Sequence, residues 1–190
     1  MNEKTLTIGG LLLLALSQIL LSFGYDFLMA QRPIDFAHWA MLIGSVLLFS
    51  LWFSLPENAT KKIGLSLMSL GIVGVAGMCM IDFLLWATHD NPEVKENLFH
   101  YILNTPSIQL PFLVIGPTLF NGGICIATYG LFKKYKWQVI LLNTGALMIG
   151  LGHMVFQNRF IPAIGGILFL IGLGSIIYTK KIKITESIGS

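Results

Sequence analysis

Charged residues are scarce in this chain. Of its 190 residues, 12 are Lys or Arg and 9 are Asp or Glu, so 11% are charged, whereas soluble domains carry about 25%. Hydrophobic residues make up 55% of the chain, and its mean hydropathy is +0.77. These values exclude an ordinary water-soluble domain. Several apolar runs of about 20 residues predict a polytopic membrane protein instead.

Cysteine and the short motifs of many enzymes are also scarce or missing. The only cysteines, Cys79 and Cys125, fall inside apolar runs without CxxC spacing, so we expect free thiols that pack as small apolar side chains. The chain has no HExxH, HxxxH or GxSxG motif, which leaves acyl transfer from a nucleophile elbow without support. Basic residues are spread over the segments that flank the apolar runs, so no nucleic-acid partner is predicted.

The apolar runs predict an all-α fold with six transmembrane helices in one membrane domain over residues 1–190. A short amphipathic helix is expected between the third and fourth spans, because Val94, Leu98 and Ile102 repeat every four residues after an Asn91-Pro92 start. The predicted spans are 5–30, 36–55, 63–88, 108–132, 137–156 and 160–178, and the predicted surface helix is 92–104.

Glycine and proline indicate how the spans pack. Gly71, Gly74 and Gly77 recur every three residues and predict a flat face for close helix approach. Gly116-Pro117 should kink the fourth span, since proline lacks a backbone donor. Small-residue pairs, Gly123 with Ala127 or Ala146 with Gly150, could pack helices within one chain or between two copies, and a homo-oligomer or a membrane complex is left open. In the lipid bilayer, close packing at such small residues drives helix association, because the hydrophobic effect does not act between helices there.

The basic residues predict the orientation in the lipid bilayer. Nine lie beside the N-terminus, the second and fourth connections and the C-terminus, and three lie on the other side. Because positive charge concentrates on the cytoplasmic side, both termini are expected in the cytoplasm of a multi-pass cell-membrane protein. The two sets are Lys4, Lys61, Lys62, Lys133, Lys134, Lys136, Lys180, Lys181 and Lys183 against Arg32, Lys95 and Arg159.

Most other ionisable side chains gather at the predicted outer end of the bundle. Asp82 lies inside the third span, where an unpaired carboxylate costs on the order of 2–3 kcal/mol. Such residues mark functional sites more often than structural ones. We therefore expect an outward-facing polar pocket. Its predicted ligand-binding residues are Asp82 and His153, with Asp26 and His38 completing the site, Trp86 beside Asp82, and Arg159 or Arg32 neutralising an anionic group.

A weak internal repeat supports this placement. Asp26-Phe27-Leu28 resembles Asp82-Phe83-Leu84, and three segments share an Ile-Gly pair, namely Leu42-Ile43-Gly44, Val114-Ile115-Gly116 and Ala163-Ile164-Gly165. The pattern predicts three related helical hairpins. Each would place one ionisable residue, Asp26, Asp82 or His153, at a similar depth.

Three functions are compatible with these observations. The first is binding or transport of a small ligand, ion or proton at the outer pocket. The second is a metal-dependent enzyme, in which Asp26, His38, Asp82 and His153 would hold zinc; haem between His38 and His153 is a related alternative. The third is an accessory or structural subunit of a membrane complex, in which Asp26 and Asp82 only pair with Arg32, Arg159 or histidine side chains.

Overall fold

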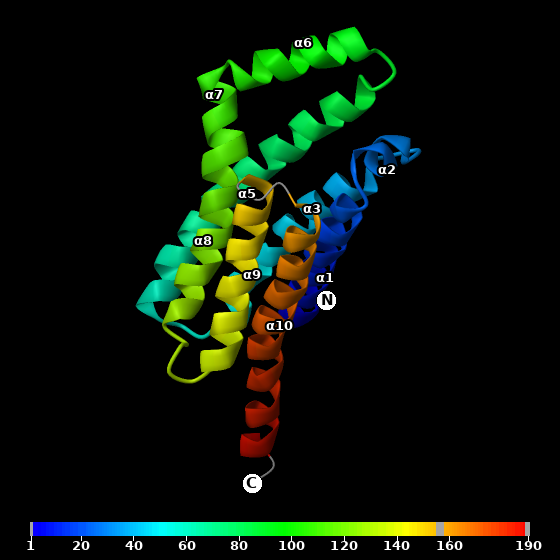
Figure 1. The fold of residues 1–190 in the computed structure, drawn as a ribbon. Coiled ribbons are helices and arrows are strands. Elements are labelled where there is room, and N and C mark those ends of the chain that lie inside the picture. The colour runs from blue at the N-terminus through cyan, green and yellow to red at the C-terminus, as the bar shows by residue number, and fades with distance from the viewer. Residues whose placement is uncertain (1, 155–157, 189–190) are drawn as a thin grey trace.

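The computed structural model describes residues 2–154 and 158–188, and every regular element in that part of the chain is helical (Figure 1). This confirms the all-α prediction. The elements are α1 (Glu3–Ser22), α2 (Tyr25–Ala30), α3 (Phe36–Leu47), the 3₁₀ turn η1 (Leu48–Ser50), α4 (Leu51–Ser54), α5 (Ala59–Ala87), α6 (Pro92–Leu103), α7 (Pro106–Ile108), the π-helix η2 (Gln109–Ile115), α8 (Gly116–Tyr129), α9 (Lys136–Met154) and α10 (Phe160–Ile188).

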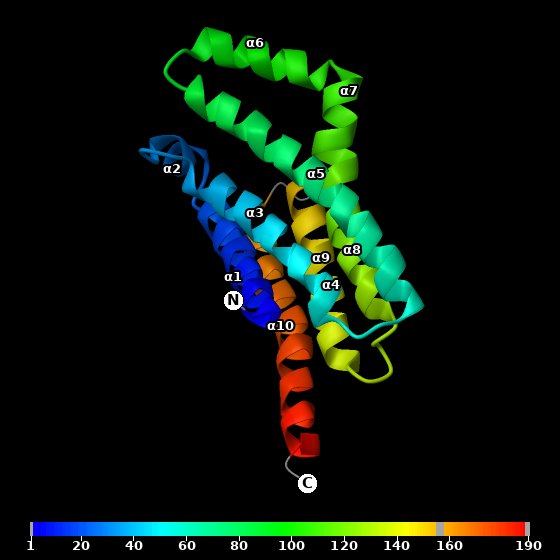
Figure 2. The ribbon, with the colours of Figure 1, turned by 180° about the vertical axis from the view of Figure 1, so that it is seen from behind.

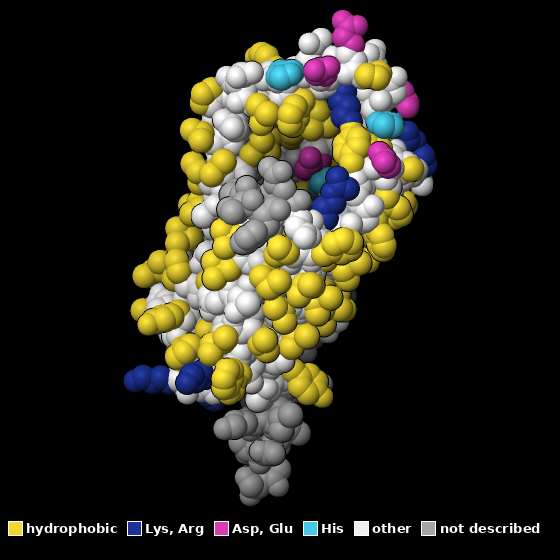
Figure 3. Space-filling model, in the orientation of Figure 1, with side chains coloured by type: hydrophobic (Ala, Val, Ile, Leu, Met, Phe, Trp, Pro, Cys, Tyr) yellow, Lys and Arg dark blue, Asp and Glu magenta, His cyan; other side chains and the backbone are white. Residues whose placement is uncertain are grey.

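Five helical segments are long and apolar enough to cross a membrane, which indicates an integral membrane protein. They are Glu3–Ser22, Phe36–Ser54, Ala59–Ala87, Pro106–Tyr129 and Phe160–Thr179. The predicted fifth span corresponds to α9, which has 19 residues but is not among these five. Figure 3 shows hydrophobic side chains over the flanks of the molecule and charged side chains at its two ends.

The first span is shorter than predicted. The sequence pattern extends it to residue 30, but α1 ends at Ser22 and a separate short helix, α2, begins at Tyr25. Gly24 between them has φ of +100°, a conformation that favours glycine and breaks the helical path. Asp26 consequently lies on α2 rather than at the end of a continuous span.

The fourth span is irregular near its predicted kink. A π-helix occupies Gln109–Ile115, with Pro111 inside it, and a regular α-helix resumes at Gly116-Pro117. Proline cannot donate its backbone hydrogen bond, so the ladder there has to be rearranged. π-Helical segments are often found at functional sites, and Leu113 of this segment lines the cavity described below.

The long helices form three antiparallel hairpins, seen from opposite sides in Figures 1 and 2: α1 with α3 and α4, α5 with α8, and α9 with α10. Small residues bring the α5 and α8 backbones together, because a Cβ at Gly71 would meet the Phe120 backbone and one at Gly74 would meet Gly116 Cα. The predicted flat glycine face is therefore confirmed. Gly123 likewise packs on Gly64 within the same chain.

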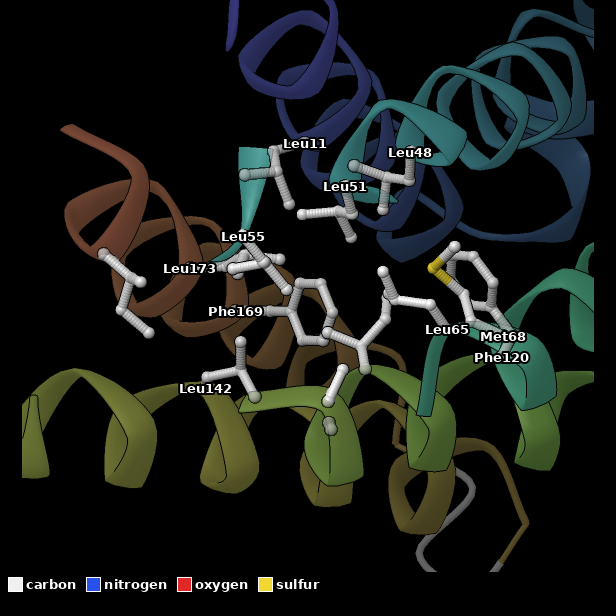
Figure 4. Close-up of a cluster of buried hydrophobic side chains, with 14 of the residues drawn as sticks. Leu11, Leu48, Leu51, Leu55, Leu65, Met68, Phe120, Leu142, Phe169 and Leu173 are labelled. Atoms are coloured by element: carbon white, nitrogen blue, oxygen red, sulfur yellow. The ribbon is translucent and has the colours of Figure 1, made fainter. Parts of the chain in front are cut away.

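The apolar core lies at the end of the bundle away from α6, where all three hairpins meet (Figure 4). Leu48 and Leu51 of the first hairpin face Leu65 of the second, and Leu142 and Leu173 of the third close the cluster. Each of these five side chains is fully buried. This core closes one end of the bundle and borders the cavity described below.

A helix, α6, occupies the residues of the predicted surface helix, and Asn91 caps it by accepting a hydrogen bond from the Val94 N–H at 3.2 Å. Figure 1 shows α6 across the end of the molecule that also carries α2. Its buried face differs from the predicted stripe, since Ile102 is buried but Val94 is exposed. Side chains between them in sequence face the cavity instead.

Candidate ligand-binding cavity

The site begins with Asp35 and His38 in the first turn of α3. Asp35 is the N-cap residue, and its Oδ1 accepts a hydrogen bond from the His38 backbone N–H at 3.2 Å. Its other oxygen, Oδ2, lies 2.6 Å from His38 Nδ1. Because an ionised carboxylate only accepts, Nδ1 donates in this contact. The helix cap therefore also fixes the orientation of the imidazole ring.

Asp82 approaches the same imidazole from α5. Its Oδ2 lies 3.2 Å from His38 Nε2. Beside this pair, Trp39 stacks on Phe83 with ring centroids 5.1 Å apart, which holds α3 against α5. The side chain of Asp35 is 0% exposed, whereas that of Asp82 is 32% exposed. Asp82 is thus the carboxylate that a bound molecule can reach.

These three side chains, the Asp35–His38–Asp82 group, set two carboxyl groups against one imidazole. An unprotonated ring nitrogen facing an ionised carboxylate at 3.2 Å is repulsive, so at least one proton resides on Nε2 or Asp82. With both carboxyl groups ionised and the imidazole protonated, the group carries a charge of −1. Within the described residues neither carboxylate forms an ion pair with a Lys or Arg.

The group borders a central cavity of about 1190 Å³ between the three hairpins. Figure 3 shows the hollow near the α6 end, with an acidic and a histidine side chain inside it. The lining is mainly apolar, unlike the polar pocket expected from the sequence. Its apolar lining includes Met41, Met78, Phe99, Phe120 and Phe169, and its polar lining includes Gln18, His38, Asp82, Asn121 and Asn143.

Charged and aromatic side chains form the outer rim of the cavity. Lys95 of α6 lies over the Tyr25 ring, with Nζ 4.0 Å from its centroid, and His89 meets the same ring edge-on. Burial lowers the pKa of Lys95 from its ordinary value. The contact between Lys95 and Tyr25 joins α6 to α2 across the mouth of the cavity.

The other predicted site residues lie apart from this group. Asp26 is exposed on α2. Arg32 lies over the Trp86 ring at 4.8 Å and donates to the Met29 and Gln31 carbonyl oxygens. Arg159 reaches the backbone at Gly24. His153 lies on α9, and its side chain is outside the described part of the structure.

Among the described side chains, the arrangement does not resemble a metal or haem site. Of the four predicted zinc ligands, the structure brings together His38 and Asp82 and leaves Asp26 exposed. In the described residues, no group of three or more His, Cys, Asp or Glu side chains is placed to hold a metal ion. Both ring nitrogens of His38 already face carboxylates, so neither is presented to a haem iron.

Two residues of the site were not predicted. Asp35 was not predicted, although the spacing of three residues to His38 at a helix start would have indicated the contact with the imidazole. Gln18 was not predicted either, and it lines the cavity with 7% of its surface exposed. Comparison with models of protein families, with curated proteins and with solved structures gives no match.

Proposed function

We propose that this is a multi-pass cell-membrane protein that binds an amphiphilic molecule with a cationic headgroup in its central cavity. One observation carries the proposal. The Asp35–His38–Asp82 group sets two carboxyl groups against one imidazole and presents Asp82 to a cavity of about 1190 Å³ that is otherwise mainly apolar. An ammonium headgroup would neutralise the Asp82 carboxylate, and an alkyl body would fill the remaining volume.

The membrane placement belongs to the same proposal. We take α9 as a sixth span, because its 19 residues pack along α10 as the second member of a hairpin. The basic residues then put the termini on the cytoplasmic side and open the cavity outward. An amphiphile would enter from the outer leaflet or from the outer aqueous phase, beneath α6.

The geometry supports a binding site better than a proton path across the bundle. A proton relay across the bundle needs a proton donor or acceptor at each end. Asp35 is enclosed, because its Oδ1 accepts from the His38 backbone N–H and its Oδ2 faces His38 Nδ1. The chain of contacts therefore starts at the cavity and ends inside the protein. In this arrangement, Asp35 fixes His38, His38 supports the charge on Asp82, and Asp82 meets the headgroup.

The first test is binding of decylamine to the purified protein in phosphatidylcholine nanodiscs, measured by calorimetry beside decanol and decanoate. We expect the amine to bind at least tenfold more tightly than the alcohol, because a buried charge pair is worth about 1.5 kcal/mol or more. Asp82→Asn should remove this preference. Asp26→Asn, at an exposed carboxylate outside the cavity, is the matched control and should bind like the wild type.

Two results would overturn the proposal. One is equal binding of the amine, alcohol and carboxylate, which would show that the cavity does not select for positive charge. The other is an amine preference that survives in Asp82→Asn or disappears in Asp26→Asn. Both variants should elute as single species on gel filtration, so that a loss of binding is not a loss of fold.

A further inference from the structure

The three hairpins are joined in a cyclic order. The second helix of each hairpin packs on the first helix of another, with α3 on α5, α8 on α9 and α10 on α1. This order is visible in the two views of Figures 1 and 2. The cavity lies inside the ring and is lined by residues of all three hairpins. Each hairpin thus offers its first helix to the cavity in an equivalent setting.

Glycines mark matching crossing points in the three hairpins. The three Ile-Gly segments of the sequence repeat all lie in second helices, and the glycine of each packs on a glycine of the first helix in its own hairpin. In the first and third hairpins the contact is reciprocal, each glycine lying against the other's carbonyl oxygen. The pairs are Gly10 with Gly44, Gly74 with Gly116 and Gly145 with Gly165.

Counting residues from these glycine crossings changes the predicted repeat. The residue eight positions after the crossing glycine of each first helix is Gln18 in α1, Asp82 in α5 and His153 in α9. Each of them is followed by three apolar residues. The counterpart of Asp82 in the first hairpin is therefore Gln18 rather than Asp26. Gln18 and Asp82 both line the cavity, and a Cβ at Gly166 of α10 would lie 3.1 Å from the Gln18 side chain. His153 holds this register position on the α9 backbone.

We propose that Gln18 is a second recognition residue of the cavity and selects a primary ammonium headgroup. This inference rests on the proposed function. Asp82 supplies the neutralising charge, and the amide oxygen of Gln18 accepts a hydrogen bond from one of the ammonium N–H groups. A trimethylammonium headgroup has the same charge but no N–H to donate. The wild-type protein should therefore prefer decylamine to decyltrimethylammonium.

The test compares these two amines on the wild type, on Gln18→Leu and on a pair of double variants in nanodiscs. Gln18→Leu should reduce the preference for the primary amine about fivefold or more while leaving trimethylammonium binding unchanged, as expected for one lost hydrogen bond to a charged group. Asp82→Gln should lose amine binding. Adding Gln18→Asp to it should restore binding within about tenfold of the wild type, because the carboxylate returns to an equivalent position around the same headgroup.

The matched control for this exchange is Asp82→Gln with Asn143→Asp. Asn143 also lines the cavity, but it lies two residues before the Gly145 crossing, and the change to aspartate preserves its shape. This control should not restore binding. Equal rescue by both double variants, or an unchanged preference in Gln18→Leu, would overturn the role of Gln18 while leaving the proposed function intact. Failure of the wild type to bind either amine would instead overturn the proposed function itself.

Discussion

At the scale of single residues, the buried carboxylate of Asp35 serves two purposes with its two oxygens. Oδ1 caps α3 and Oδ2 orients His38. A buried charge that lost either partner would be costly, since breaking a buried ion pair costs about 3–5 kcal/mol and losing an N-cap about 1 kcal/mol. The enclosed position of Asp35 prevents it from touching a ligand, so it is a positioning residue.

The separate roles of the two Asp35 oxygens predict different effects for two substitutions at this residue. Asp35→Ala removes the cap and the partner of the imidazole, and it should lower the free energy of unfolding by about 3 kcal/mol or more. Asp35→Asn keeps an oxygen for the cap and should cost less. Its amide would donate to Nδ1 instead of accepting from it, so Nδ1 should lose its proton and the ring proton should reside on Nε2.

Steric trapping in bicelles would measure the two stabilities, and nitrogen chemical shifts of the His38 ring would report the position of the proton. Equal stability losses in the two variants would contradict the separate capping role. An unchanged ring tautomer in Asp35→Asn would contradict the orienting role of Oδ2. Asp26→Asn, at the exposed carboxylate of α2, is the control for a change of one surface charge.

The residues of the site were only partly predictable from the sequence. Asp82 and His38 were both expected there, because ionisable residues in apolar spans need compensation. Their contact depends on the packing of α3 against α5, which no local pattern specifies. The repeat matched Asp82 to Asp26 through the shared Asp-Phe-Leu letters. The register that we infer from the crossing glycines, which matches Asp82 to Gln18, depends on which glycines meet across each hairpin.

At the scale of helices, close backbone contact determines how the hairpins pair. The α5 and α8 helices meet at glycines where an added Cβ would strike backbone atoms, and backbone atoms cannot move aside as a flexible side chain can. This feature was predictable, since glycines spaced every three residues form one face. The early end of α1 at Ser22 was not predicted, because apolar residues continue beyond it through α2.

Alanine substitution at two glycines of the same hairpin should have different effects on stability. Gly74→Ala places a Cβ against Gly116 Cα and should lower the free energy of unfolding by about 1–3 kcal/mol as the helices separate. Gly122→Ala meets no atom within 4 Å and should be neutral or stabilising by up to about 1 kcal/mol, since alanine favours helix. Unfolding in mixed micelles measures both. A neutral Gly74→Ala would contradict the close α5–α8 crossing.

At the scale of the whole molecule, the two ends of the bundle differ in chemistry. The Asp35–His38–Asp82 group, the cavity mouth and α6 lie at one end, and the turn of residues 130–135 lies at the other beside the apolar core. Lys61 at this second end is buried, donating from Nζ to the Leu55 carbonyl oxygen at 3.1 Å and pairing with Glu57. It is therefore less suited to report orientation than the exposed Lys134.

The asymmetry of the two ends predicts which surface labels from outside the cell. In a Cys79→Ala/Cys125→Ala background, a single cysteine replacing Glu93 on α6 should react with a membrane-impermeant maleimide on intact cells. A cysteine replacing Lys134 should react only after the membrane is opened, because positive charge is retained in the cytoplasm. Both positions are exposed, so a difference in labelling reports the side of the membrane rather than burial.

Labelling of Lys134→Cys but not Glu93→Cys on intact cells would show the reverse orientation, in which the cavity opens toward the cytoplasm. The amine site would then face cytoplasmic rather than external ligands, while its recognition by Asp82 would be unaffected.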